Sequence, residues 1–491
     1  MTDPVVATIV IGYFILSFII GIIGVRKIKT SEHYFGATRL FGPFMMGIAS
    51  CAAVMSGFGF IGGPGMVYKL GATSLWITLT APFGFAFGFW MLGKRLRLMA
   101  EVRPIGSLPD VVYYRYKSNA ARALLALSLL LGVVAYLGTQ VLSGGIVVAG
   151  LLGVSLEVGI LLAFGVVLAY TAIGGMVASI LTDFFQGLIM IIAGIAALIL
   201  VLGMTGGTEG LFTTVGQQMD PKLIDPLGKG TWMLALCWWW VFSLTNCSQP
   251  HQTTKFYTLK NWKDLKVGAV VSGLGYMLTS LLWIFVGYAA LWLVAKGFVP
   301  PLERPDDAAI AVVTHLPVWM AGLLYAGLLA AIMSTASGFI AIASAAVARD
   351  LTKAFGKELD QKRQIFWGRI VTVVITILAL IFGYYGGYMV LILGTLGWGY
   401  FASAIFPVFV IGLNWKRATR EGAVASLAVA LVANIAFLIL EKGLGFTMPY
   451  GIPSYVISIM ASILTLIFVS FVTKGATEEE LDPDIKAIME I

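Results

Sequence analysis

Apolar residues run along the chain in long segments, which are interrupted by short stretches of charged residues, glycine and proline. A helix that crosses the hydrocarbon core of a membrane needs about 20 residues, most of them apolar. By this measure the pattern predicts thirteen membrane-spanning helices. They cover residues 4–25, 40–68, 73–93, 123–150, 156–177, 184–204, 231–256, 267–295, 318–346, 367–386, 388–413, 421–440 and 453–473. The sequence therefore predicts an all-α membrane protein.

The composition supports this fold class and excludes several others. Hydrophobic residues make up 59% of the chain and charged residues only 11%, whereas a soluble domain is about 45–50% apolar. A disordered chain or a coiled coil would need far more charged side chains. The three cysteines lie in apolar segments without the spacing of a metal site or a disulfide framework. Neither kind of site is predicted.

The charges predict how the chain lies in the membrane. With the N-terminus outside, 26 of the 32 lysines and arginines, Lys255 among them, fall in cytoplasmic loops or at the cytoplasmic end. Basic loops stay on the inside, so we expect a multi-pass cell-membrane protein with its N-terminus outside and its C-terminus cytoplasmic. Insertion into the lipid bilayer explains the net charge of +8, and no nucleic-acid partner is predicted. The acidic tail, residues 474–491, is expected to be a solvated cytoplasmic end.

Two of the predicted helices carry sequences that interrupt a helix. Residues 55–65 read MSGFGFIGGPG, and residues 245–251 read TNCSQPH, where Pro250 has no N–H and should free the carbonyl of Asn246. Small residues also allow helices to pack closely, which is the alternative explanation. The two segments are five spans apart and run in opposite directions, so residues 40–204 and 231–413 can form two inverted five-helix repeats. This arrangement is typical of secondary transporters that bind their substrate at the bilayer midplane.

Neutral oxygen atoms are the candidate chemistry inside the spans. Ionisable groups are rare there, which disfavours a proton relay and a charged pore. In AAIMSTASG, residues 330–338, the carbonyl of Ala331 and the hydroxyls of Ser334 and Thr335 share one helix face. Hard cations bind several such oxygens. Together with backbone carbonyls freed near Ala52 and Met55, these groups predict a cation site, although such hydroxyls can also bond to their own helix.

Asp183 is flanked by apolar sequence on both sides, in residues 174–187. Two interpretations remain open for this carboxylate. Thr182 and Asp183 could cap the start of a helix. Alternatively, Asp183 could be a way station for a cation on its path to the cytoplasm.

These segments resemble the sodium/solute symporter family over nearly the whole chain. The resemblance rests on residues 34–71, on 174–187, on SQPH at 248–251 and, most specifically, on 328–351. It implies the LeuT-type inverted-repeat fold as a single transporter domain, with an extra helix at residues 4–25 and two more at 421–473. It also implies a conserved sodium site and places Asp183 on the inward sodium path. The site would use the carbonyls of Ala52, Met55 and Ala331 and the hydroxyls of Ser334 and Thr335.

The implied substrate pocket is small, aromatic and uncharged. Its residues would be Ser56, Gly57, Phe58, Gln140, Phe242, Asn246, Pro250, Trp398 and Tyr400. The pocket departs from proline carriers of the family, which have an aspartate where Val54 stands and other aromatic residues in place of Phe242 and Asn246. An unpaired ionic ligand would be costly to bury there. Backbone N–H groups at a half-helix could nevertheless hold one carboxylate.

We therefore expect a sodium-driven symporter, not an enzyme, that imports a small monocarboxylate or a neutral amino acid by alternating access. Na+ would be the coupling ion, without an organic cofactor or an obligatory protein partner. A sodium-coupled sugar symporter is the alternative within transport. An ion channel or a transporter-like sensor is the alternative of a different class, and it would need a polar pore lining or a signalling domain.

Overall fold

The computed structural model describes residues 3–26, 30–385, 389–475 and 482–490 and shows a bundle of helices throughout these ranges. In the first part of the chain the helices are α1 (Pro4–Val25), α2 (Ser31–Phe35), α3 (Pro43–Val54), α4 (Gly63–Leu70), α5 (Leu75–Thr78), α6 (Ala81–Gly88), α7 (Lys94–Val102), α8 (Leu108–Tyr116), α9 (Asn119–Leu152), α10 (Leu156–Thr205) and α11 (Gly207–Gln218). The second part has α12 (Trp232–Leu244), α13 (Pro250–Thr258), α14 (Leu265–Ala295), α15 (Ala308–Val313), α16 (Val318–Ala345), α17 (Thr352–Ala354), α18 (Gln361–Tyr385), α19 (Val390–Ile405), α20 (Arg420–Gly443), α21 (Ser454–Val472) and α22 (Pro483–Met489). Wider π-type turns extend four of them, at η1 (Phe58–Gly62), η3 (Phe89–Gly93), η8 (Ala346–Leu351) and η9 (Phe406–Ile411). Short 3-10 turns lie at η2 (Gly71–Ser74), η4 (Pro221–Leu223), η5 (Thr245–Ser248), η6 (Trp262–Asp264), η7 (Pro305–Asp307) and η10 (Pro449–Gly451).

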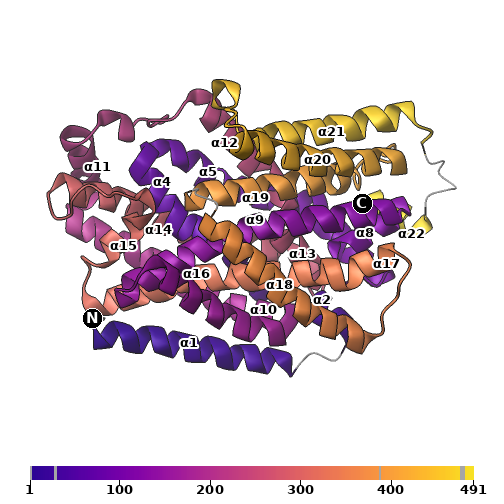
Figure 1. The fold of residues 1–491 in the computed structure, drawn as a ribbon, viewed down its shortest axis with the longest axis horizontal. Helices are drawn as coiled ribbons and strands as arrows, with labels where there is room; N and C mark the ends of the chain where they lie inside the picture. The colour runs from indigo at the N-terminus through magenta and orange to yellow at the C-terminus, as the bar shows by residue number, and fades with distance from the viewer. Residues whose placement is uncertain (1–2, 27–29, 386–388, 476–481, 491) are drawn as a thin grey trace.

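Ten helices of the described chain are long and apolar enough to cross a membrane. The long helices run side by side along the length of the molecule, with the two chain termini towards opposite ends (Figure 1). We call the end that carries α11 and α15 the N-terminal face, and the end that carries α8, α17 and α22 the C-terminal face. The all-helical prediction is confirmed. The count of thirteen spans stays a prediction, because α10 carries two predicted spans in one helix that is interrupted at Gly175 (φ 51°).

Some sequence predictions fall on residues that the structure does not describe. They include the span ends at 386 and 388, two of the basic residues near the N-terminus, Lys27 and Lys29, and tail residues 476–481.

Both predicted helix interruptions are present. The first helix pauses after α3, where Met55 adopts an extended conformation (φ −79°, ψ 94°), and it resumes as η1 and α4. Glycine is required in the resumed part because a Cβ on Gly63 would lie 2.2 Å from the ring of Trp283. The second helix stops at the end of α12, passes through η5 and restarts at Pro250.

One detail of the second interruption differs from the prediction. The carbonyl of Asn246 is not free, because it accepts a hydrogen bond from the backbone N–H of Gln249 (3.1 Å). The missing N–H of Pro250 is thus compensated by a tighter 3-10 turn one residue earlier. Gln249 is the residue that becomes extended (φ −75°, ψ 121°).

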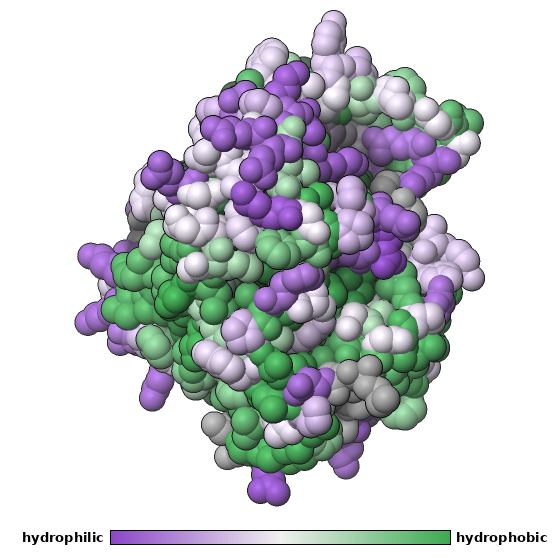
Figure 2. All heavy atoms as spheres, turned by 90° about the vertical axis from the view of Figure 1, so that its left-hand side faces the viewer, coloured by the Kyte–Doolittle hydropathy of each residue, from purple (hydrophilic) through white to green (hydrophobic). Residues whose placement is uncertain are grey.

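A buried carboxylate ties three segments together near the N-terminal face. Asp306 lies in η7, and its Oδ2 accepts a hydrogen bond from the backbone N–H of Val390 at the start of α19 (3.0 Å). A Cβ on Gly65 of α4 would lie 2.8 Å from its Oδ1, so glycine allows this close approach. Hydrophilic residues gather over the upper half of this face, with hydrophobic residues along its lower flanks (Figure 2). Burial raises the pKa of Asp306 to about 6.

We expect Asp306 to lower the stability of the folded protein as the pH rises from about 4 to about 6. In this window the folded chain keeps a proton that the unfolded chain has already lost, so deprotonation favours unfolding. Above the window the buried charge costs about 3 kcal/mol, since one pKa unit is worth about 1.4 kcal/mol. Asp306→Asn keeps an acceptor for Val390 and should flatten the pH dependence of the melting temperature in detergent, whereas the exposed control Asp225→Asn should not. Equal slopes for the wild type and Asp306→Asn would contradict this expectation.

The helix α22 is docked on the C-terminal face. Three of its apolar side chains are buried, and the helix packs against α7. Asp482, just before it, pairs with Arg103 (2.7 Å) and Lys117 (3.1 Å). Burial alone would raise the pKa of Asp482, but the bonds from these two residues lower it to about 2. The prediction of a solvated tail is therefore wrong for residues 482–490.

Candidate functional site

Oxygen atoms from α3 and α16 meet at the first helix interruption. The hydroxyl of Ser334 donates to the carbonyls of Ala52 (3.0 Å) and Ala331 (3.1 Å). The hydroxyl of Thr335 donates to the carbonyl of Ala53 (3.0 Å), one residue from the predicted partner. All five residues are buried. We call Ala52, Ala53, Ala331, Ser334 and Thr335 the oxygen cluster.

The oxygen cluster joins most of the predicted sodium ligands. Met55, the remaining predicted ligand, is the extended residue that follows α3, and its own N–H bonds to the carbonyl of Cys51 (2.9 Å). Apart from the carbonyl of Cys51, the carbonyls of the last turn of α3 have no N–H from a following helical turn to accept, since the helix stops there. They are therefore available to hydroxyls or to a cation.

Further hydroxyl groups continue from the oxygen cluster to Asp183. Ser337 donates to the carbonyl of Ser334 (3.0 Å), and the hydroxyls of Ser337 and Ser179 are 3.1 Å apart. Ser179 in turn donates to Oδ2 of Asp183 (3.4 Å). The path crosses from α16 to α10 and passes through buried side chains only.

Asp183 lies inside α10, eight residues after the interruption at Gly175. Thr182 donates to the carbonyls of Ala178 (3.0 Å) and Ser179 (2.9 Å), as a residue in mid-helix does. The helix-cap interpretation of Thr182 and Asp183 is therefore wrong. The Oδ2 of Asp183 receives a hydrogen bond from the ammonium of Lys255 (2.7 Å).

Lys255 is the residue of this site that the sequence analysis placed elsewhere. It was assigned to a cytoplasmic loop, but it lies in α13 and its side chain is only 2% exposed. A signal was present in the sequence. Lys255 follows Pro250 by five residues, so it falls one and a half turns into a helix that begins at that proline. A lysine side chain that far inside the bundle needs a negatively charged partner.

An aromatic cluster fills the space between the two interruptions. The ring of Phe58 stacks on Phe242 at a centroid distance of 5.9 Å and lies 6.1 Å from Trp398. Phe242 and Trp398 are 4.7 Å apart. These three predicted pocket residues come from η1, α12 and α19 and are all buried. Aromatic faces of this kind can enclose the apolar part of a small solute.

Polar groups at the edge of the aromatic cluster complete the candidate pocket. Oε1 of Gln140 accepts from the N–H of Gly57 (3.0 Å), while the hydroxyls of Ser56 and Tyr136 are 3.2 Å apart. Nε2 of Gln249 donates to the carbonyl of Trp398 (3.3 Å). Tyr136 and Gln249 were not predicted as pocket residues. Tyrosine and glutamine are both ordinary in these segments, so nothing in the sequence marks the two positions.

Several buried polar atoms here have no hydrogen-bond partner among the described residues. They are Nε2 of Gln140, Nε1 of Trp398, Oε1 of Gln249 and both ring nitrogens of His251. The ring of His251 lies 6.3 Å from that of Trp398. Unpaired buried groups are costly, so a cluster of them indicates a place where a ligand completes the hydrogen bonds.

Three other predicted pocket residues lie in η5, α13 and α19. Nδ2 of Asn246 donates to the carbonyl of Ala81 in α6 (3.0 Å), so this side chain holds α6. Pro250 starts α13. Tyr400 follows Trp398 by two residues on α19, and residues at this spacing point to different sides of a helix. Their contact with a substrate stays a prediction.

A buried ion network lies at the C-terminal face. Asp110 of α8 pairs with Arg349 of η8 (2.5 Å) and with Arg122 of α9 (3.3 Å). Ser107 donates to Asp350 (2.6 Å) and accepts from Arg349 (3.4 Å). These side chains connect segments more than 200 residues apart in the sequence.

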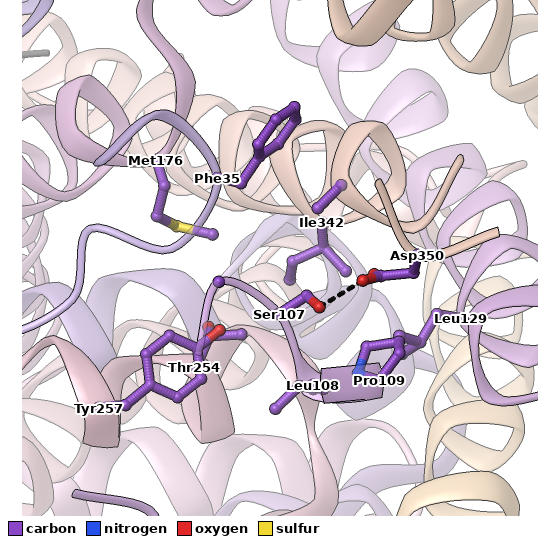
Figure 3. A pocket seen from close by; sticks show the side chains of 12 residues that line it. Phe35, Ser107, Leu108, Pro109, Leu129, Met176, Thr254, Tyr257, Ile342 and Asp350 are labelled. Atoms are coloured by element: carbon purple, nitrogen blue, oxygen red, sulfur yellow. Dashed lines mark hydrogen bonds between the residues drawn. The ribbon is translucent and has the colours of Figure 1, made fainter. Parts of the chain in front are cut away.

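A cavity of about 10 Å3 lies beside this network, with room for about one water molecule. The side chains of Met176, Thr254, Tyr257 and Asp350 surround it, and Figure 3 shows the hydrogen bond from Ser107 to Asp350 at its edge. Towards the N-terminal face, a pocket of about 280 Å3 is lined by Trp238 and Thr395 among others. Trp398 of the aromatic cluster is one turn further along α19 than Thr395 of this pocket.

Comparison with known proteins agrees with this architecture. The sodium:solute symporter family matches residues 34–430. The chain is 29% identical over 475 residues to the osmoregulated proline transporter OpuE of Bacillus subtilis (strain 168), covering 94% of each chain. It is also 29% identical to the sodium/proline symporter of Staphylococcus aureus (strain JH9), covering 92% of this chain and 90% of the relative.

A solved structure has the same fold. It is the substrate-bound, outward-open state of a Na+-coupled sialic acid symporter, with a TM-score of 0.80, 18% identity and coverage of 97% of this chain and 99% of the other. The relatives are transporters, which agrees with the prediction that this chain is not an enzyme. Since the family match extends over most of the sequence, the chain belongs to the sodium:solute symporter family.

Proposed function

We propose that this chain couples Na+ to the uptake of a small neutral amino acid, with proline as the first candidate. The observation that carries the proposal is the oxygen cluster between α3 and α16, which adjoins an uncharged aromatic pocket. Several neutral oxygens suit a hard monovalent cation. The coordinating oxygens would be those of Ala52, Met55, Ala331, Ser334 and Thr335.

The unpartnered polar atoms favour an amino acid over a simple monocarboxylate. Nε2 of Gln140 and Nε1 of Trp398 are donors, which suit a carboxylate. Oε1 of Gln249 is an acceptor, which suits an ammonium group. A monocarboxylate would leave this acceptor unpaired, whereas a zwitterion would satisfy both kinds of atom. The names of the curated relatives point to proline.

The transport cycle we propose follows from the two interrupted helices. Na+ bound between α3 and α16 stabilises the outward-open state, and the substrate binds beside it at the midplane. The two inverted repeats, residues 40–204 and 231–413, then rock and expose the site on the side of the C-terminal face. The N-terminal face is the outer one in this proposal, as the distribution of basic residues predicts. Coupling requires only that Na+ binds one state more tightly than the other.

Uptake by the purified protein in proteoliposomes tests the proposal. An inward Na+ gradient should drive accumulation of radiolabelled proline, and the same gradient of K+ should not. Unlabelled alanine, lactate, pyruvate, glucose and galactose, added in turn, identify the substrate class. Displacement by glucose or galactose alone would establish the sugar-carrier alternative, and equal uptake in K+ would exclude sodium coupling.

A further inference from the structure

Asp183 and Lys255 form an ion pair inside the bundle. Their side chains are 0% and 2% exposed, and the Nζ–Oδ2 distance is 2.7 Å. The two residues belong to different helices, α10 and α13. The other carboxylate oxygen, Oδ1 of Asp183, is buried without a hydrogen-bond partner among the described residues. The carboxylate can therefore accept another hydrogen bond, or bind another cation, beside the ammonium of Lys255.

A carboxylate at this depth requires a positive charge beside it. Removing one partner of a buried pair leaves an uncompensated charge, which strongly destabilises the folded protein. Ser179 and Ser337 supply dipoles but no charge, and they connect Asp183 to the oxygen cluster through contacts of 3.0–3.4 Å. A cation in the oxygen cluster could thus pass to Asp183 along hydroxyl groups. The place beside the carboxylate is already taken by the ammonium of Lys255.

We propose that Asp183 is the centre of a second cation site and that Lys255 fills it with a tethered ammonium group. This inference rests on the proposed sodium coupling. Since the tethered charge cannot leave, the wild-type chain binds one Na+, at the oxygen cluster. Without the amine, Asp183 is open to a second Na+, which Oδ1, Oδ2 and the hydroxyls of Ser179 and Ser337 would coordinate.

The central experiment replaces Lys255 with methionine, which has a similar length and no charge. We expect the Hill coefficient of uptake for Na+ to rise from about 1 in the wild type to about 2 in Lys255→Met, because the number of interacting sites limits this coefficient. Lys255→Arg keeps the charge and should stay near the wild-type value. Asp183→Asn/Lys255→Met removes both charges and should also bind one Na+. Lys260→Met, at an exposed position nearby, is the matched control and should change nothing.

A direct count of bound ions makes the result independent of turnover. Equilibrium binding of radioactive Na+ to the purified protein should give one ion for each wild-type chain and two for each Lys255→Met chain. Two ions on the wild type, or one on Lys255→Met, would overturn the inference. So would a Lys255→Met chain that fails to fold even in high Na+, because Na+ would then be unable to replace the ammonium. If the wild type takes up substrate without Na+ and binds no Na+, the proposed function itself fails. This outcome is distinct from the others.

Discussion

Ser334→Ala and Thr335→Ala are each expected to raise the half-saturating Na+ concentration of uptake by about 10-fold to about 100-fold. Each hydroxyl is a potential ligand in the oxygen cluster, where Ser334 contacts the carbonyls of Ala52 and Ala331. A hydrogen-bonding group that acts on a charge is worth about 1.5–3 kcal/mol, and about 1.4 kcal/mol is a factor of ten in affinity. The half-saturating Na+ concentration is obtained from initial uptake rates measured over a series of Na+ concentrations, with K+ as the replacement ion.

Two further variants separate ion binding from general loss of stability. Thr335→Ser keeps the hydroxyl and should keep the Na+ dependence near that of the wild type. Thr376→Ala removes a buried hydroxyl that bonds to the carbonyl of Thr372 within α18, away from the oxygen cluster. It should lower the melting temperature without changing the half-saturating Na+ concentration. An unchanged value in Ser334→Ala and Thr335→Ala would exclude these hydroxyls as ligands.

Arg349→Met is expected to open the C-terminal face. The substitution leaves Asp110 with Arg122 alone and removes the bond to Ser107. Breaking a buried pair of this kind costs about 3–5 kcal/mol. This cost weakens the closed arrangement of α8 and η8 relative to an open one. We therefore expect states in which the small cavity beside the network becomes continuous with water.

Cysteine labelling measures this opening. Met176 lines the cavity and is buried, so Met176→Cys should react slowly with a membrane-impermeant maleimide applied to the C-terminal face. The reaction should become at least about tenfold faster in Arg349→Met, a change that corresponds to about 1.4 kcal/mol. Arg363→Met is the control, since Arg363 pairs with Asp360 at an exposed position (3.5 Å), and such pairs contribute little. Equal labelling rates in Arg349→Met and Arg363→Met would show that the ion network does not hold this face closed.

The sequence was most informative where a local rule decides the structure. Glycines and prolines at 55–65 and 245–251 interrupt two helices, and both interruptions are present. The one-turn spacing of Ala331, Ser334 and Thr335 predicted a shared helix face, and the structure brings that face against α3. In each case residues within a few positions of one another supply the whole signal.

The predictions were wrong where the structure depends on contacts between distant residues. Asp183 was interpreted in part as a cap because nothing in the nearby sequence shows that α10 continues past it from Gly175. Lys255 was counted with a loop because its partner lies 72 residues earlier in the chain. Asp110 and Arg349 are similar, since each on its own is an ordinary charged residue near the end of a span. Only the packed bundle shows that they form a pair.

The docked helix α22 has a consequence for how the molecule is completed during its synthesis. Pro483–Met489 is the last described helix of the chain, and it packs on α7, which was made almost 400 residues earlier. Arg103 and Lys117 therefore stay without their partner Asp482 until the ribosome has made the described helices that lie between them and α22. During insertion of the membrane spans, the C-terminal face remains unfinished at α7 and α8. The contacts of α22 form only after all the described spans, up to α21, have been synthesised.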